Sequence, residues 1–213
     1  MRVQTAGVLF LSVVLFAIPA AAGVLYENGP AADDRDGWTI NFGFIVSDTF
    51  YLGASSTLTG FAFNAWLFPG DDLTSVEVSI TSLEDGGTTY FDQTLAFTRG
   101  HCDVNAYGYD VCVETASFSG LPLSSGTYWI NLQNAMLNNN NDNVFWDENS
   151  GYGCHSQGCP SLASENTVGM IPSESFTIEG NSSGTETVPE PGSVVLLGSG
   201  VLAIASMLRR KLF

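Results

Sequence analysis

The side chains best suited to redox or metal chemistry in this 213-residue chain are its four cysteines and two histidines: Cys102, Cys112, Cys154, Cys159, His101 and His155. If the chain is exported, as its N-terminus indicates below, an even cysteine count favours two disulfides. Chain order suggests Cys102 with Cys112 and Cys154 with Cys159, among three possible connectivities. Each histidine adjoins a cysteine, which would also suit zinc, but an oxidising compartment favours disulfides over thiolate ligands.

The sequence contains no pattern of a nucleophilic hydrolase or a zinc protease. Neither a G-x-S-x-G elbow nor an HExxH pair occurs, and both histidines lie in the suspected disulfide loops. Paired carboxylates, such as Asp147 with Glu148 or Asp71 with Asp72, could serve a glycoside hydrolase, because such acids need only lie close in space. We therefore predict no catalytic residue and keep a secreted polysaccharide-active hydrolase as the alternative.

Binding chemistry is easier to motivate than catalysis. Trp146, Asp147 and Glu148 form a candidate glycan-binding site, because aromatic rings beside planar polar groups can hold sugar rings. Trp66 and Trp129 are expected in the core. The Asp- and Asn-rich segments 33–37 and 138–142 offer hard oxygen ligands, so calcium is a possible cofactor, although neither follows EF-hand spacing and we assign no metal ligand.

Charge excludes one class of partner. All 22 acidic residues lie between Glu27 and Glu190, where the only basic residues are Arg35 and Arg99, a net charge of −20. Nucleic acid is excluded as a partner, since its binding requires cations to displace phosphate counterions. Aromatic residues are frequent in the same stretch, so it should fold.

Residues 23–180 read as one β-rich domain followed by a linker at 181–187. Runs that alternate or favour strands cover residues 38–46, 58–68, 73–80, 89–98, 111–118, 127–133 and 175–179. Turn sequences separate them at 69–72, 84–87 and 123–126. The spacing predicts an all-β fold, an antiparallel β-sandwich of jelly-roll type, with a barrel or prism as the rival.

The elements at the two ends predict export. Residues 1–22 form a secretory signal peptide, in which Ala20 and Ala22 precede cleavage at Gly23. Near the other end, residues 192–208 carry no charge and are just long enough for a transmembrane helix. The basic residues behind them, Arg209, Arg210 and Lys211, would stay in the cytoplasm, which places the acidic domain outside the inner membrane.

Residues 188–213 resemble the PEP-CTERM sorting signal, a Pro-Glu-Pro tripeptide followed by an apolar helix and a basic cluster. Pro189, Glu190 and Pro191 match the tripeptide, and 209–211 match the cluster, although Leu212 and Phe213 extend beyond it. The resemblance implies recognition and cleavage by an exosortase while the chain is anchored in the inner membrane. It further implies delivery to the cell surface or the extracellular matrix of a Gram-negative-type bacterium.

The domain also resembles a group of uncharacterised PEP-CTERM proteins. The shared stretches are 24–30 (VLYENGP), 126–129 (GTYW) and 146–149 (WDEN). That resemblance supports a sandwich and leaves the function open. From the tail and the aromatic residues together, we expect a non-enzymatic module associated with exopolysaccharide or biofilm matrix; a purely structural coat protein is a further alternative.

Overall fold

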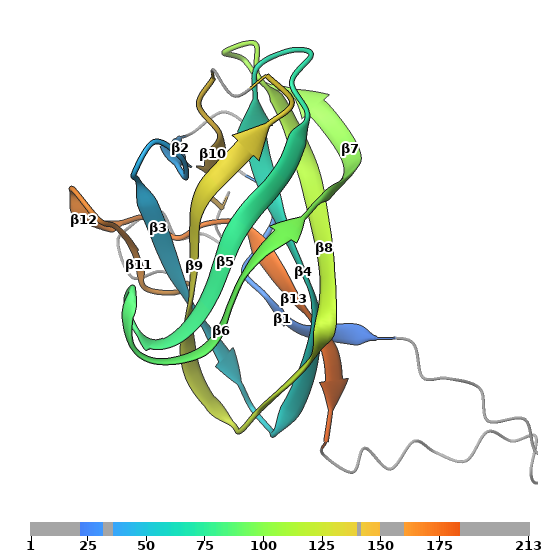
Figure 1. Cartoon of the computed structure of the whole chain (residues 1–213), viewed down its shortest axis with the longest axis vertical. Helices are drawn as coiled ribbons and strands as arrows, with labels where there is room; N and C mark the ends of the chain where they lie inside the picture. The colour runs from blue at the N-terminus through green and yellow to red at the C-terminus, as the bar shows by residue number, and fades with distance from the viewer. Residues whose placement is uncertain (1–21, 32–35, 140–141, 150–159, 184–213) are drawn as a thin grey trace, which may run out of the picture.

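The computed structural model describes residues 22–31, 36–139, 142–149 and 160–183, and within these ranges all regular structure is strand (Figure 1). The strands are β1 (Gly23–Glu27), β2 (Gly37–Thr39), β3 (Ile45–Leu52), β4 (Ser56–Leu67), β5 (Leu73–Leu83), β6 (Gly86–Ala96), β7 (Thr98–Val104), β8 (Asp110–Leu123), β9 (Gly126–Leu137), β10 (Phe145–Asp147), β11 (Ala163–Glu165), β12 (Gly169–Ile171) and β13 (Phe176–Ser182).

The strands form two antiparallel sheets that pack face to face. One sheet has the order β1-β13-β4-β10-β2, and β8 joins the free edge of β4 and pairs in turn with β7. The other has the order β12-β11-β3-β9-β5-β6. The predicted all-β antiparallel sandwich is thus confirmed, and the finer jelly-roll connection stays a prediction.

Strand periodicity explains how the core forms. In β4 the side chains of Phe61, Phe63 and Ala65 alternate with half-buried neighbours and point between the sheets. Val76, Val78 and Ile80 of β5 do the same from the opposite sheet, as their spacing in the sequence predicts. Burial of these apolar faces is the main force that holds the two sheets together.

One predicted strand is wrong. The run 38–46 is split into β2 and the start of β3 by a turn in which the Phe44 amide donates to the Asn41 carbonyl oxygen at 3.1 Å. Phe42 and Gly43 have φ angles of 56° and 91°, in the left-handed region that interrupts a strand. The alternating pattern concealed this turn because Phe42 is not a typical turn residue.

The first and last described strands lie side by side. Gly23 of β1 pairs with Gly180 of β13, and Ser182 at the end of β13 pairs with Ser56 at the start of β4 (Figure 1). β13 extends two residues into the segment predicted as a linker. From Ser56 to Trp66 along β4 is about 33 Å at the usual rise of a strand. The end of β4 that carries Trp66 is therefore remote from the point where the chain leaves the domain.

Candidate functional site

The structure corrects the expectation that Trp146 offers a surface for a sugar. Its side chain is 0% exposed and its indole packs edge-on against Phe61 and Phe63 at centroid distances of 6.3 and 6.1 Å. The indole Nε1 donates to the Ser175 carbonyl oxygen at 2.9 Å. A ring so enclosed can contact no ligand. The polar residues that precede Trp146 in the sequence end before β10, where the chain enters the sandwich.

Asp147 and Glu148 are also buried. The Asp147 carboxylate accepts a hydrogen bond from Trp66 Nε1, and its carbonyl oxygen accepts one from the Ser175 amide at 2.8 Å. Glu148 pairs with Glu174 across an isolated bridge, and its amide donates to the Asp36 carbonyl oxygen at 3.0 Å. These two acids thus fix the backbone and Trp66 and do not form an open surface.

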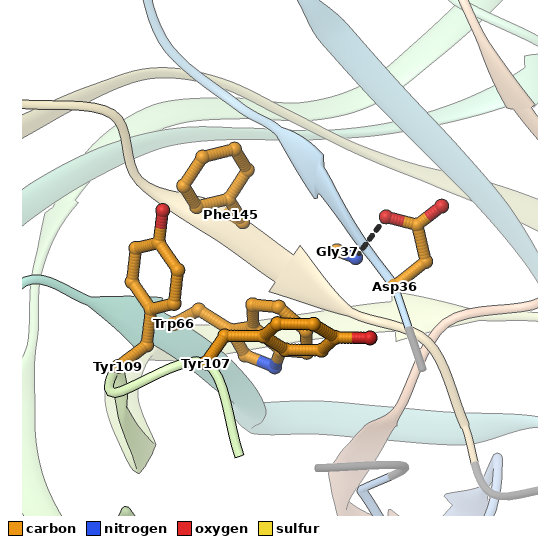
Figure 2. A pocket seen from close by; sticks show the side chains of 6 residues that line it. All are labelled: Asp36, Gly37, Trp66, Tyr107, Tyr109 and Phe145. Carbon is orange, nitrogen blue, oxygen red and sulfur yellow. Dashed lines mark hydrogen bonds between the residues drawn. The ribbon is translucent and has the colours of Figure 1, made fainter. Parts of the chain in front are cut away.

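The candidate site is a pocket beside Trp66, on the outer face of the sheet. Its described lining residues are Asp36, Gly37, Trp66, Tyr107, Tyr109 and Phe145, and its volume is about 530 Å³ (Figure 2). We call it the aromatic pocket. In the view of Figure 2, Tyr107 overlies the indole of Trp66, Phe145 lies across from that pair, and Asp36 and Tyr109 stand on opposite sides.

Trp66 forms the base of the pocket because of its place in β4. It follows Ala62 and Asn64 on the outward face of the strand, the opposite face from Phe61 and Phe63. Trp66 is 6% exposed, as expected of a core residue. The loop between β7 and β8, and not the second sheet, covers its ring. Phe145 of β10 pairs directly with Trp66, which brings both rings to the same face.

Two tyrosines complete the aromatic lining. The ring of Tyr107 stacks on Trp66 at a centroid distance of 5.9 Å, and that of Tyr109 contacts Trp66 at 5.6 Å and Phe145 at 5.7 Å. Tyr107 is 63% exposed, whereas Tyr109 is half-buried. The pocket therefore presents one open aromatic face above a packed aromatic base.

The loop that carries these tyrosines is held in shape by a disulfide and by hydrogen bonds to Asn105. Cys102 of β7 and Cys112 of β8 form the predicted disulfide at its base. Above it, the Asn105 side-chain oxygen accepts hydrogen bonds from the amides of Tyr107 and Tyr109 at 3.0 and 2.9 Å. A bridge that closes about ten residues contributes about 2 to 3 kcal/mol in the chain-entropy account. The tyrosines are thus positioned before any ligand arrives.

Gly37 permits the close approach of the strands under the pocket. A Cβ atom there would lie 3.0 Å from the Phe145 Cβ and 3.4 Å from the Trp66 ring. Any larger residue would push Phe145 and Trp66 apart. The predicted strand over 38–46 started one residue too late to include this position.

Among the described residues, the lining of the aromatic pocket includes an acidic side chain and no basic one. Asp36 is exposed at its rim, and none of the lining residues that the structure describes is basic. Arg99, on β7, is engaged elsewhere: its guanidinium lies 3.0 Å from an Asp72 oxygen and 3.4 Å from a Glu114 oxygen, and it donates to the Asp71 carbonyl oxygen.

A second group of acids is buried at the junction of the sheets. Asp48 accepts hydrogen bonds from the amides of Thr49 and Glu174 at 2.6 and 2.7 Å and from the hydroxyl of Ser161 at 2.5 Å. Burial raises the pKa of Asp48 to about 7 against these hydrogen bonds. Glu174 is 0% exposed, and neither of its carboxylate oxygens has a hydrogen-bond partner among the residues that the structure describes. Burial, followed by the charges of Asp48 and Asp147, raises its pKa well above the usual value.

The predictions on metals and on the second disulfide remain largely outside the described residues. Cys154, Cys159 and His155 lie there, as do residues 33–35 and 140–141 of the two candidate calcium segments. Within the described ranges, no group of three or more His, Cys, Asp or Glu side chains could hold a metal ion. Asp71 and Asp142 do share Asn139 as a hydrogen-bond donor. Calcium binding stays a prediction.

The two terminal signals also lie outside the described residues. Among those described, no helix is long and apolar enough to cross a membrane. The signal peptide, its cleavage residues Ala20 and Ala22, and the transmembrane helix at 192–208 therefore stay predictions from the sequence.

Fold and site together define an antiparallel β-sandwich protein with a rigid aromatic pocket at the end remote from its exit strand. Comparison with protein families adds how the chain is sorted: residues 187–211 match the PEP-CTERM protein-sorting motif. The chain therefore carries the signal of an exported exosortase substrate, and the resemblance of Pro189, Glu190, Pro191, Arg209, Arg210 and Lys211 to that motif is confirmed. No curated protein matches the chain.

The aromatic pocket shows what sequence reasoning missed. Tyr107, Tyr109 and Phe145 were not singled out, although Tyr107-Gly108-Tyr109 lies between two cysteines ten residues apart. Aromatic residues in a short disulfide loop are a usable signal, because such a loop has no core of its own in which to bury them.

Proposed function

We propose that the protein is a non-enzymatic module of the cell surface or extracellular matrix, and that it binds exopolysaccharide through the aromatic pocket. The observation that carries the proposal is the convergence of four aromatic rings from β4, β10 and the Asn105–Tyr109 loop on one open pocket. Aromatic faces hold the apolar faces of sugar rings, while neighbouring polar groups fix their orientation.

Two features of the pocket favour binding of an extended polymer. Its lining is held by the disulfide and by Asn105, so little conformational entropy is lost when a ligand binds. Trp66 in the pocket also lies about 33 Å along β4 from Ser56. Ser56 pairs with Ser182 at the end of β13, the last strand before the sorting signal. A polysaccharide could therefore reach the pocket even while the tail is in the membrane.

The proposal predicts that Tyr107→Ala and Phe145→Ala each weaken binding to the producer's own exopolysaccharide by about tenfold, the equivalent of about 1.4 kcal/mol. Each substitution removes one aromatic face from the pocket while leaving the core between the sheets intact. The measurement is depletion of full-length protein, purified in detergent, by immobilised exopolysaccharide over a range of concentrations.

Tyr51→Ala is the matched control, because Tyr51 is similarly exposed at 58% and lies on β3, outside the aromatic pocket. It should bind as the wild type does. If Tyr107→Ala and Phe145→Ala also retain full binding, the pocket is not the site. Release of reducing ends during the incubation would favour the hydrolase alternative. Absence of any binding by the wild type would favour a structural coat protein.

A further inference from the structure

The aromatic pocket has the composition of a site for a positively charged group. Four aromatic side chains line it together with one carboxylate, that of Asp36, and the described lining includes no lysine, arginine or histidine. The faces of aromatic rings carry negative potential and attract ammonium groups, most strongly when the ring is tryptophan. The Asp36 carboxylate can accept a hydrogen bond from a neutral sugar, but it would attract an ammonium group more strongly and would repel an acidic sugar.

The indole at the base of the pocket is further polarised. Trp66 Nε1 donates its hydrogen to the buried carboxylate of Asp147. A carboxylate acceptor draws the N–H proton and leaves more electron density on the indole, on which the exposed ring of Tyr107 stacks. Asp147 thus holds Trp66 in place as the base of the pocket, and it is itself too deeply buried to contact a ligand.

The wider field of the domain acts in the same direction. Between Glu27 and Glu190 the chain carries a net charge of −20, and such a field raises the local concentration of cations and lowers that of anions. Arg99, on β7 of the hairpin that holds the tyrosines, is paired with Asp72 and Glu114. It is thus not available to receive an acidic sugar.

We propose that the aromatic pocket binds a protonated amino group of a glycan that contains free amino sugars. The inference rests on the proposed function and names its ligand class. The ammonium group would lie against the aromatic faces near Asp36, and the sugar ring would stack on the exposed ring of Tyr107. The open rim leaves part of the ammonium hydrated, which limits the cost of removing it from water.

The test uses isothermal titration of the full-length protein in detergent with three six-sugar oligomers, one of glucosamine, one of N-acetylglucosamine and one of glucose. At about pH 5.5 the free amines are protonated. The glucosamine oligomer should bind at least about tenfold more tightly than either neutral oligomer. Asp36→Asn should remove about fivefold of that preference and leave neutral oligomers unaffected, and Phe145→Ala should weaken all binding.

Asp92→Asn is the matched control, since Asp92 is exposed on β6 of the other sheet. It changes the net charge by the same amount as Asp36→Asn and should leave the preference intact. Equal binding of glucosamine and glucose oligomers would overturn this inference and leave the proposed function standing. Failure of every oligomer, together with failure on the producer's exopolysaccharide, would overturn both. Choline should be titrated in the same way. If it binds more tightly than the glucosamine oligomer, the pocket is a site for a ligand other than a glycan, and both proposals are overturned.

Discussion

Raising the pH from about 4 to about 8 should lower the melting temperature of this protein by roughly 15 °C or more. The cause is three acids whose pKa is raised by burial: Asp48 to about 7, Glu114 to about 7, and Glu174 well above its usual value. Each pKa unit of difference between the folded and unfolded states is worth about 1.4 kcal/mol, and about 1 kcal/mol shifts the melting temperature of a domain this size by about 2 to 4 °C.

The sign follows from proton binding. Between the unfolded pKa values, near 4, and the raised folded values, the folded protein binds more protons than the unfolded chain. Stability contributed by the protonated acids is therefore complete at about pH 4 and is lost as the pH rises through about 7, and for Glu174 beyond that. Repulsion among the many ionised surface acids adds to the loss.

Glu174 gives the cleanest variant for this prediction. Its two carboxylate oxygens have no hydrogen-bond partner within the described part of the chain, whereas those of Asp48 accept several hydrogen bonds. Glu174→Gln keeps the shape and cannot ionise, so its melting temperature should fall less with pH than that of the wild type. Asp92→Asn, at an exposed site, should leave the profile unchanged. A wild-type melting temperature that rises steadily from pH 4 to pH 8 would contradict the assignment of these acids.

Trp146→Ala should cost about 3 to 5 kcal/mol of unfolding free energy, the usual range for truncating a large buried aromatic residue. Its ring is fully enclosed and contacts Phe61, Phe63 and Phe176. The substitution also removes the shorter of two hydrogen bonds to the Ser175 carbonyl oxygen and leaves the one from the Asn64 amide at 3.4 Å. Because domains are stable by only about 5 to 15 kcal/mol in total, this loss would bring the protein close to unfolding.

Trp129→Ala is the matched comparison, since it removes the same side chain from a half-buried position on β9. We expect a clearly smaller loss there, measured for both variants by urea denaturation at about pH 5. Equal losses at the two positions would mean that Trp146 is not in the core, and would return it to the candidate glycan surface.

The parts of the fold that could be predicted from the sequence are those set by local chemistry. Alternation predicted the strand over 73–80, and glycine content predicted the turn at 84–87. Chain order suggested Cys102 with Cys112 among three possible connectivities, and this disulfide occurs in the structure. The sorting motif is likewise a local composite, and it is confirmed at 187–211.

The aromatic pocket could not be predicted in the same way because it depends on pairing between distant strands. Phe145 meets Trp66 only through the register of β10 on β4, a separation of 79 residues. Trp146 is adjacent in sequence, yet the alternation of β10 turns it to the core and Phe145 to the surface. The polar residues before Trp146 suggested that its side chain is exposed. Sequence neighbours, however, do not indicate which face of a sheet a side chain occupies.

The intact mass of the mature protein from its producing cells gives the most direct test of export and processing. We predict a chain that begins at Gly23, ends near the Pro189–Pro191 tripeptide, and is four hydrogens lighter than its reduced form because of two disulfides. Recovery of the complete Met1 to Phe213 chain, soluble and with free thiols, would contradict it.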